Sequence, residues 1–68
     1  MTVFSRPALL EAKRALASTL SKCEKVLPKV AASPSQATLL RRRIEALRIS
    51  LSLIERELAQ AGDAADRE

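Results

Sequence analysis

The chain has 68 residues, of which 47% are hydrophobic and 29% charged, with a formal net charge of +4. This composition excludes a disordered chain, while the length is below the ~70–80 residues at which one hydrophobic core gives comfortable stability. With one cysteine and no histidine, an intrachain disulfide is excluded and a zinc site is not expected. Small domains without these supports usually associate, so we expect the fold to be completed by another chain.

The first predicted element is a helix over residues 6–30. Ser5 is placed to act as its N-cap, because a serine side chain can accept a hydrogen bond from the first helical turn. Phe4 and Leu9 have the spacing of a hydrophobic staple, which predicts that Phe4 packs inside. Pro28 cannot donate to the carbonyl four residues earlier, so we expect a kink or an end of the helix near this residue.

A turn over residues 31–33 and a second helix over residues 34–61 follow. Ser33 begins a capping box, since a proline occupies the next position and a glutamine stands three residues after the serine. Gly62 is suited to the left-handed conformation that ends many helices. Residues 63–68 are therefore predicted to form a polar C-terminal tail outside a hairpin domain that ends at Gly62.

Apolar residues recur in both predicted helices in alternating steps of three and four residues, which is typical of a helical packing stripe. Because the connecting turn is short, the two stripes should face each other in an antiparallel pair. The predicted fold class is therefore all-α, with an antiparallel two-helix hairpin. Its seam comprises Leu9, Leu16, Leu20, Cys23, Leu27, Leu40, Ile44, Leu47, Leu51, Ile54 and Leu58.

A further row of apolar residues lies beside the seam on the second helix, formed by Leu39, Ala46, Ile49 and Leu53. A two-helix hairpin has no third element to cover this row, and leaving a large apolar side chain in water costs roughly 1.5–3 kcal/mol relative to burial. We expect the row to be an oligomer interface. The simplest assembly is a four-helix bundle formed by homodimerisation, with a higher homo-oligomer or another protein as the alternatives.

Charged residues on the second helix are spread around it. Arg41, Arg42 and Arg43 point in directions about 100° apart, so they cannot follow one nucleic-acid backbone. Arg43 lies between the seam and the second apolar row. Its candidate partners are Glu55 or Glu57 of a symmetry-related antiparallel copy, in a pair that sets orientation more than stability.

The first helix has a more continuous basic face, which is the candidate anion-binding site. It consists of Arg14, Lys22, Lys25 and Lys29. These cations could follow nucleic-acid phosphates, although surface lysines also serve simply to keep a small protein soluble. Phe4 is the only aromatic residue, so the chain has little with which to stack on unpaired bases. Nucleic-acid backbone binding is therefore the second hypothesis.

No catalytic site is predicted, because histidine is absent and no two carboxylates share a predicted buried face. A single glycine leaves no glycine-rich phosphate loop, and no cofactor is expected. Cys23 lies in the apolar stripe, where a thiol acts as a small hydrophobe. If Cys23 were exposed, the flanking Lys22 and Lys25 would favour a reactive thiolate, so redox sensing is the alternative role of this cysteine.

One stretch has a family resemblance. The segment LLRRRIEALRISLSLIEREL, residues 39–58, resembles the long first helix of the all-helical chorismate mutases, in which arginines on intertwined helices bind a dicarboxylate. Further active-site residues of that family lie on later helices that this sequence does not predict. We therefore carry no catalytic residue over and expect a non-enzymatic protein.

Cellular location can be inferred only from simple signals. No apolar run approaches the ~18–20 residues of a membrane span, and the first residues lack the pattern of a secretory signal. An unpaired cysteine fits a reducing compartment. We therefore expect no membrane span and a cytoplasmic location.

Overall fold

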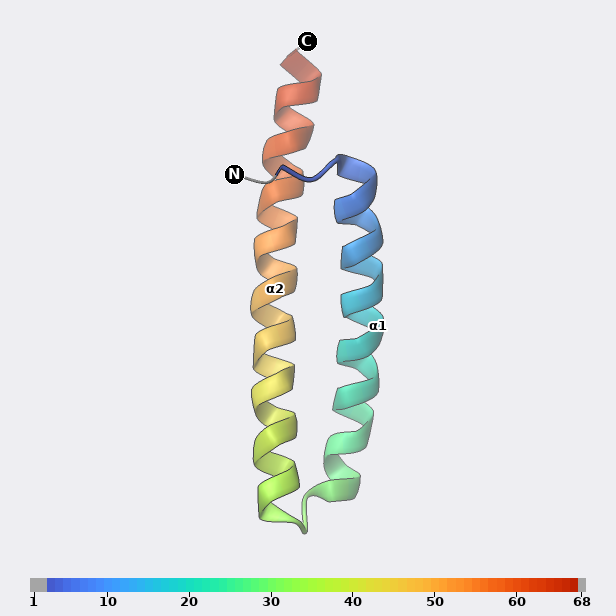
Figure 1. The fold of residues 1–68 in the computed structure, drawn as a ribbon, viewed down its shortest axis with the longest axis vertical. Helices are drawn as coiled ribbons and strands as arrows, with labels where there is room; N and C mark the ends of the chain where they lie inside the picture. Colours follow the sequence, from blue (N-terminus) through green and yellow to red (C-terminus); the bar gives the residue numbers. More distant parts are fainter. Residues whose placement is uncertain (1–2, 68) are drawn as a thin grey trace.

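The protein is an all-helical hairpin (Figure 1). The computed structural model describes the backbone of residues 3–67 and the side chains of residues 3–60. Helix α1 covers Arg6–Val30 and helix α2 covers Pro34–Arg67. The two helices run antiparallel and pack against each other along the length of α1, while the last turns of α2 extend past the start of α1 (Figure 1).

Helix α1 begins with the predicted serine cap. The side chain of Ser5 accepts a hydrogen bond from the backbone N–H of Ala8 at 3.2 Å, and its carbonyl accepts from the N–H of Leu9 at 3.0 Å. Phe4, in contrast, remains 63% exposed and does not pack inside as its staple spacing suggests. Pro28 lies inside α1, which continues to Val30; a proline this close to the helix end removes only one backbone bond.

A tight turn over residues 31–33 joins the helices. The backbone N–H of Ser33 donates to the carbonyl of Val30 at 2.9 Å and closes the turn. The N–H of Ala37 then donates to the carbonyl of Ser33 at 2.9 Å, which is the first bond of α2. A connection this short forces the second helix back along the first, so the two apolar stripes come face to face.

The C-terminal boundary of α2 differs from the prediction. The helix does not end near Ala61 with Gly62 in a left-handed cap, and residues 63–67 are helical rather than a tail outside the helix. A glycine inside a helix costs only about 1 kcal/mol relative to alanine. Ala61 precedes this glycine and Ala64 and Ala65 follow Asp63; alanine is the best helix former, so the cost does not stop the helix.

The contact between the helices is thin. Among residues 3–60, only Leu9, Ala37, Ile44 and Leu58 are buried. The other residues of the seam lie between the helices but remain half-buried, namely Leu16, Leu20, Cys23, Leu27, Leu40, Leu47, Leu51 and Ile54. Within the described part of the chain, neither helix has a stretch long and apolar enough to cross a membrane.

Candidate interaction surfaces

Two ion pairs join the helices on one side of the seam. Lys13 Nζ lies 3.7 Å from Glu55 Oε1, and Arg48 Nη2 lies 2.9 Å from Glu24 Oε2. Each of these four residues follows a seam residue by four positions, which places all of them on the same side of the two stripes. Charges that flank an apolar seam in this way fix the register of paired helices.

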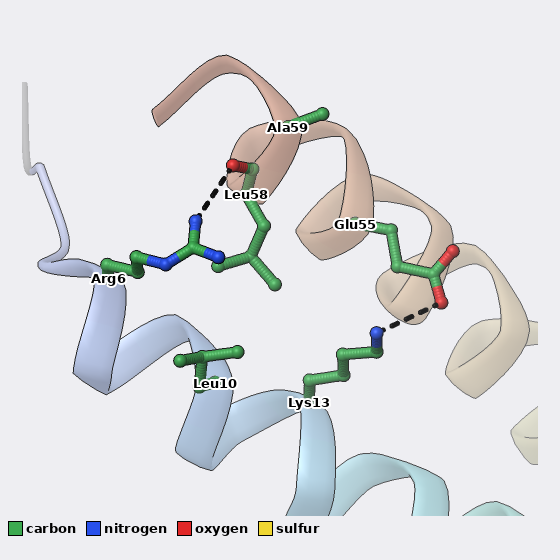
Figure 2. A pocket seen from close by; sticks show the side chains of 6 residues that line it. All are labelled: Arg6, Leu10, Lys13, Glu55, Leu58 and Ala59. Carbon is green, nitrogen blue, oxygen red and sulfur yellow. Dashed lines mark hydrogen bonds and ion pairs between the residues drawn. The ribbon is translucent and has the colours of Figure 1, made fainter. Parts of the chain in front are cut away.

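A third polar contact continues this line toward the end of the hairpin (Figure 2). Arg6 Nη1 donates to the backbone carbonyl of Leu58 at 3.3 Å. Figure 2 shows the side chains of Leu10 and Leu58 near this bond and the Lys13–Glu55 pair. We call the side of the hairpin that carries these three contacts the polar edge; it comprises Arg6, Lys13, Glu24, Arg48, Glu55 and the carbonyl of Leu58.

The other side of the seam has a different character. We call this side the open edge. Most of its residues follow a seam residue by three positions, and the others lie next to these residues on the helix surface. Within residues 3–60, no hydrogen bond or ion pair between side chains joins α1 to α2 there. The open edge comprises Ala15, Thr19 and Val26 on α1 and Leu39, Arg43, Ala46, Ser50 and Glu57 on α2.

A groove lies on the open edge near the turn. It is lined by Val26, Val30, Gln36, Leu39, Leu40 and Arg43, so both helices contribute to it. Val26 is 41% exposed and Leu39 53% exposed, although both belong to residue types that are usually buried. This part of the hairpin therefore presents apolar side chains from two helices to one shared space.

The two hydroxyl groups on the open edge are satisfied within their own helices. Thr19 Oγ1 donates to the carbonyl of Ala15 at 3.0 Å, and Ser50 Oγ donates to the carbonyl of Ala46 at 2.8 Å. Their donors are already used, so covering these small residues would leave no hydroxyl proton without an acceptor. The open edge is thus chemically suited to close contact with another helix.

The residues of the predicted interface row on α2 are all exposed in the hairpin. Leu39 and Ala46 belong to the open edge, whereas Ile49 is two residues from each of the seam residues Leu47 and Leu51 and so lies on the face of α2 away from α1. Leu53 follows Ala46 by seven residues and so lies on the same line of α2 as Leu39 and Ala46. The three large side chains of this row are 52–54% exposed in the hairpin, so each offers apolar surface that α1 does not cover.

The predicted anion-binding residues lie on the outer face of α1. Arg14, Lys22, Lys25 and Lys29 are all exposed, and none forms an ion pair with another residue in the described part of the chain. The helix rises ~1.5 Å per residue, so these cations span about 22 Å. Their positive charge is therefore available to a partner along most of one face.

Groups that could support chemistry are sparse in the described residues. Cys23 is a free thiol, half-buried in the seam as its place in the apolar stripe suggests. No group of three or more histidine, cysteine or acidic side chains suited to hold a metal ion occurs among the residues described. The features that the structure does organise are surfaces rather than a cavity with reactive groups.

The polar edge does not emerge when each helix is considered separately. Helical spacing favours a pair between Arg48 and Glu45 on the same helix, but Arg48 pairs with Glu24 on the other helix. The signal is present, since Lys13, Glu24, Arg48 and Glu55 each follow a seam residue by four positions. Reading those positions across the antiparallel pair would have found both ion pairs.

Comparison with known proteins adds no relative: no protein-family model, no curated protein and no solved structure matches the chain.

Proposed function

We propose that the protein is a non-enzymatic helical hairpin that associates with a second copy of itself into a four-helix bundle. The bundle acts as an assembly or regulatory module. The observation that carries this proposal is the incomplete burial of the seam. Only four side chains among residues 3–60 are buried, while the other leucines of both stripes and Ile54 remain partly open to water.

Covering the exposed apolar side chains would favour association. Burying one large aliphatic side chain contributes roughly 1.5–3 kcal/mol, and a whole domain is stable by only about 5–15 kcal/mol. Leu39 and Leu53 are about half exposed, and the seam residues that follow them, Leu40 and Ile54, are half-buried. Covering these side chains therefore contributes a free energy comparable with the stability of a small domain.

The side of association follows from the two edges. The polar edge is already occupied by ion pairs between α1 and α2, whereas the open edge presents apolar side chains from both helices. Two hairpins that stack their open edges would enclose both seams within four helices. A second copy is the simplest partner, because closed symmetric homodimers are the commonest oligomers of soluble proteins.

A pair of matched substitutions tests this proposal. Leu53→Glu places a carboxylate on exposed apolar surface of α2, whereas Ser52→Glu introduces the same charge one residue earlier, where the helix turns it away from the open edge. We expect Leu53→Glu to abolish the dependence of the melting temperature on protein concentration and Ser52→Glu to preserve it. Equal behaviour of the two variants would contradict the proposed interface.

The basic face of α1 supports a second candidate function, which is binding to a nucleic-acid backbone. Its four cations are exposed and free of ion pairs in the described part of the chain, and they share one face. Backbone binding of this kind depends steeply on salt, because each neutralised phosphate releases counterions. The two functions are compatible, since the basic face lies on α1 away from α2.

Neutral substitutions test the second candidate. The triple variant combines Lys22→Gln, Lys25→Gln and Lys29→Gln. The plot of log affinity against log salt for a mixed-sequence duplex should become shallower by about 2.7, roughly 0.9 for each phosphate that the variant no longer neutralises. The control is Lys13→Gln, because this lysine is engaged with Glu55. Absence of binding to RNA or DNA at low salt would exclude this function.

A further inference from the structure

We propose that the two copies meet antiparallel along α2, with Ser50 of each copy at a two-fold axis and Arg43 of each copy paired with Glu57 of the other. This inference rests on the proposed homodimer and specifies its orientation and register. The juxtaposition that carries it is a line of three residues on the open edge, formed by Arg43, Ser50 and Glu57.

The three residues form a straight, charge-graded line. Each follows a seam residue by three positions, and successive members are seven residues apart, so they lie nearly above one another on α2. The line has a positive charge at one end, a small neutral residue at its centre and a negative charge at the other end. It is therefore complementary to itself when one copy is reversed.

The ion pairs of the polar edge remove the competing partner. Glu55 lies 3.7 Å from Lys13 of its own chain, so this carboxylate is already engaged. Arg43 and Glu57 are both exposed, and neither forms an ion pair within residues 3–60. Of the two acidic residues that could face Arg43 of a second copy, only Glu57 is thus available.

Symmetry then fixes the orientation. A parallel pairing in register would place Arg43 against Arg43 and Glu57 against Glu57, and like charges in such positions oppose association. An antiparallel pairing with Ser50 on the two-fold axis places Arg43 opposite Glu57 because each lies seven residues from Ser50. The pair forms twice, about 10 Å to either side of the axis at ~1.5 Å per residue.

The first helix is compatible with the same axis. The two ion pairs show which parts of the helices lie at the same level. Lys13 pairs with Glu55, and Glu24 pairs with Arg48. Thr19 lies between the two paired residues of α1, and Ser50 lies between the two paired residues of α2. The same level of the hairpin therefore carries a small hydroxyl residue on the open edge of each helix. Both hydroxyls are bonded to carbonyls of their own helices, so both helices can approach their symmetry mates closely there.

Apolar residues flank the charged line on both sides. Leu39, Ala46 and Leu53 lie on its outer side, and the seam residues Leu40, Leu47 and Ile54 lie on its inner side. Burial of these rows supplies the association energy, whereas two partly exposed ion pairs contribute little. The role of Arg43 and Glu57 is to select one orientation and register.

Charge reversal tests the orientation. Sedimentation equilibrium of Arg43→Glu and Glu57→Arg should show dimer dissociation constants raised by about tenfold, because each single variant replaces two attractions with two repulsions. The double variant restores both pairs with exchanged signs and should return to within about twofold of the original. The inference would be overturned if the single reversals left the dimer dissociation constant unchanged, or if the double variant did not restore it. Either result would leave the proposed homodimer intact. A monomeric original protein would overturn both.

Disulfide trapping tests the register independently of charge. In a Cys23→Ala background, oxidation of Ser50→Cys should give a covalent dimer, since residues on a two-fold axis can meet within the ~4.4–6.8 Å between α-carbons that a disulfide requires. The matched variant Arg43→Cys should remain uncrosslinked, because its symmetry mate lies about 20 Å away at ~1.5 Å per residue. If both variants cross-link, the dimer is parallel and the inference is wrong. If neither variant cross-links, Ser50 does not lie on the two-fold axis. Helical circular dichroism verifies folding of each variant.

Discussion

Arg48 on α2 donates from Nη2 to Glu24 Oε2 on α1 at 2.9 Å, and this contact defines which side of the hairpin is closed. With the Lys13–Glu55 pair it fixes how far each helix is shifted along the other. The opposite side has no such contact among residues 3–60 and keeps its apolar side chains exposed. The two edges of one thin hairpin therefore differ in the contacts they make and in the apolar surface they expose.

The Glu24–Arg48 pair should make a small, salt-dependent contribution to stability. A double-mutant cycle with Glu24→Gln and Arg48→Gln is expected to give a coupling free energy of about 0.2–1 kcal/mol, because both side chains are exposed to water. The coupling should shrink at high salt. Urea unfolding at one fixed protein concentration provides the measurement, and a coupling of zero at low salt would contradict the observed pair.

Removal of the N-cap should destabilise α1. Ser5→Ala loses the hydrogen bond from the N–H of Ala8, which is expected to cost about 1 kcal/mol. The control is Ser21→Ala, an exposed serine in the middle of α1, where alanine is the better helix former and little change or slight stabilisation is expected. Thermal unfolding of both variants at the same concentration compares them, and equal effects would exclude a specific capping role.

Two isoleucines on α2 offer the same chemical change in different environments. Ile44 is 5% exposed and faces α1, whereas Ile49 is 52% exposed on the outer face. Ile44→Ala should cost about 2–5 kcal/mol, while Ile49→Ala should change the free energy of unfolding by about 0.5 kcal/mol or less. Urea unfolding measures both. A large loss in Ile49→Ala would show that the outer face is buried in the assembled protein.

Gly62 should behave as an interior helix residue. Because α2 continues through this position to Arg67, Gly62→Ala should increase the helical signal in circular dichroism and protect nearby amides from hydrogen exchange. The expected gain is about 0.5–1 kcal/mol. A left-handed cap would give the opposite result, since alanine is strained at positive φ.

The hairpin followed from the periodicity of the sequence, because steps of three and four residues specify one face of a helix wherever they continue. The end of α2 did not follow from the sequence. Glycine costs only about 1 kcal/mol inside a helix, and the alanines near Gly62 favour its continuation. Phe4 was also predicted incorrectly. It precedes the first helical turn and remains exposed, whereas Leu9 is buried within the seam.

The two edges could have been distinguished only in part. Positions four residues after the seam residues carry the charges that pair across the hairpin, but their partners depend on a register that helical spacing does not specify. The exposure of Leu39 and Val26 in one groove likewise needs both helices placed side by side. A surface shared by two helices is a property of their packing, and each stripe read separately does not contain it.

Sedimentation equilibrium of the unmodified protein tests the central claim most directly. If a second hairpin covers the open edge as proposed, the species at micromolar concentration has twice the mass of one chain and dissociates on dilution. A single-chain mass that does not change with concentration would contradict the proposed homodimer.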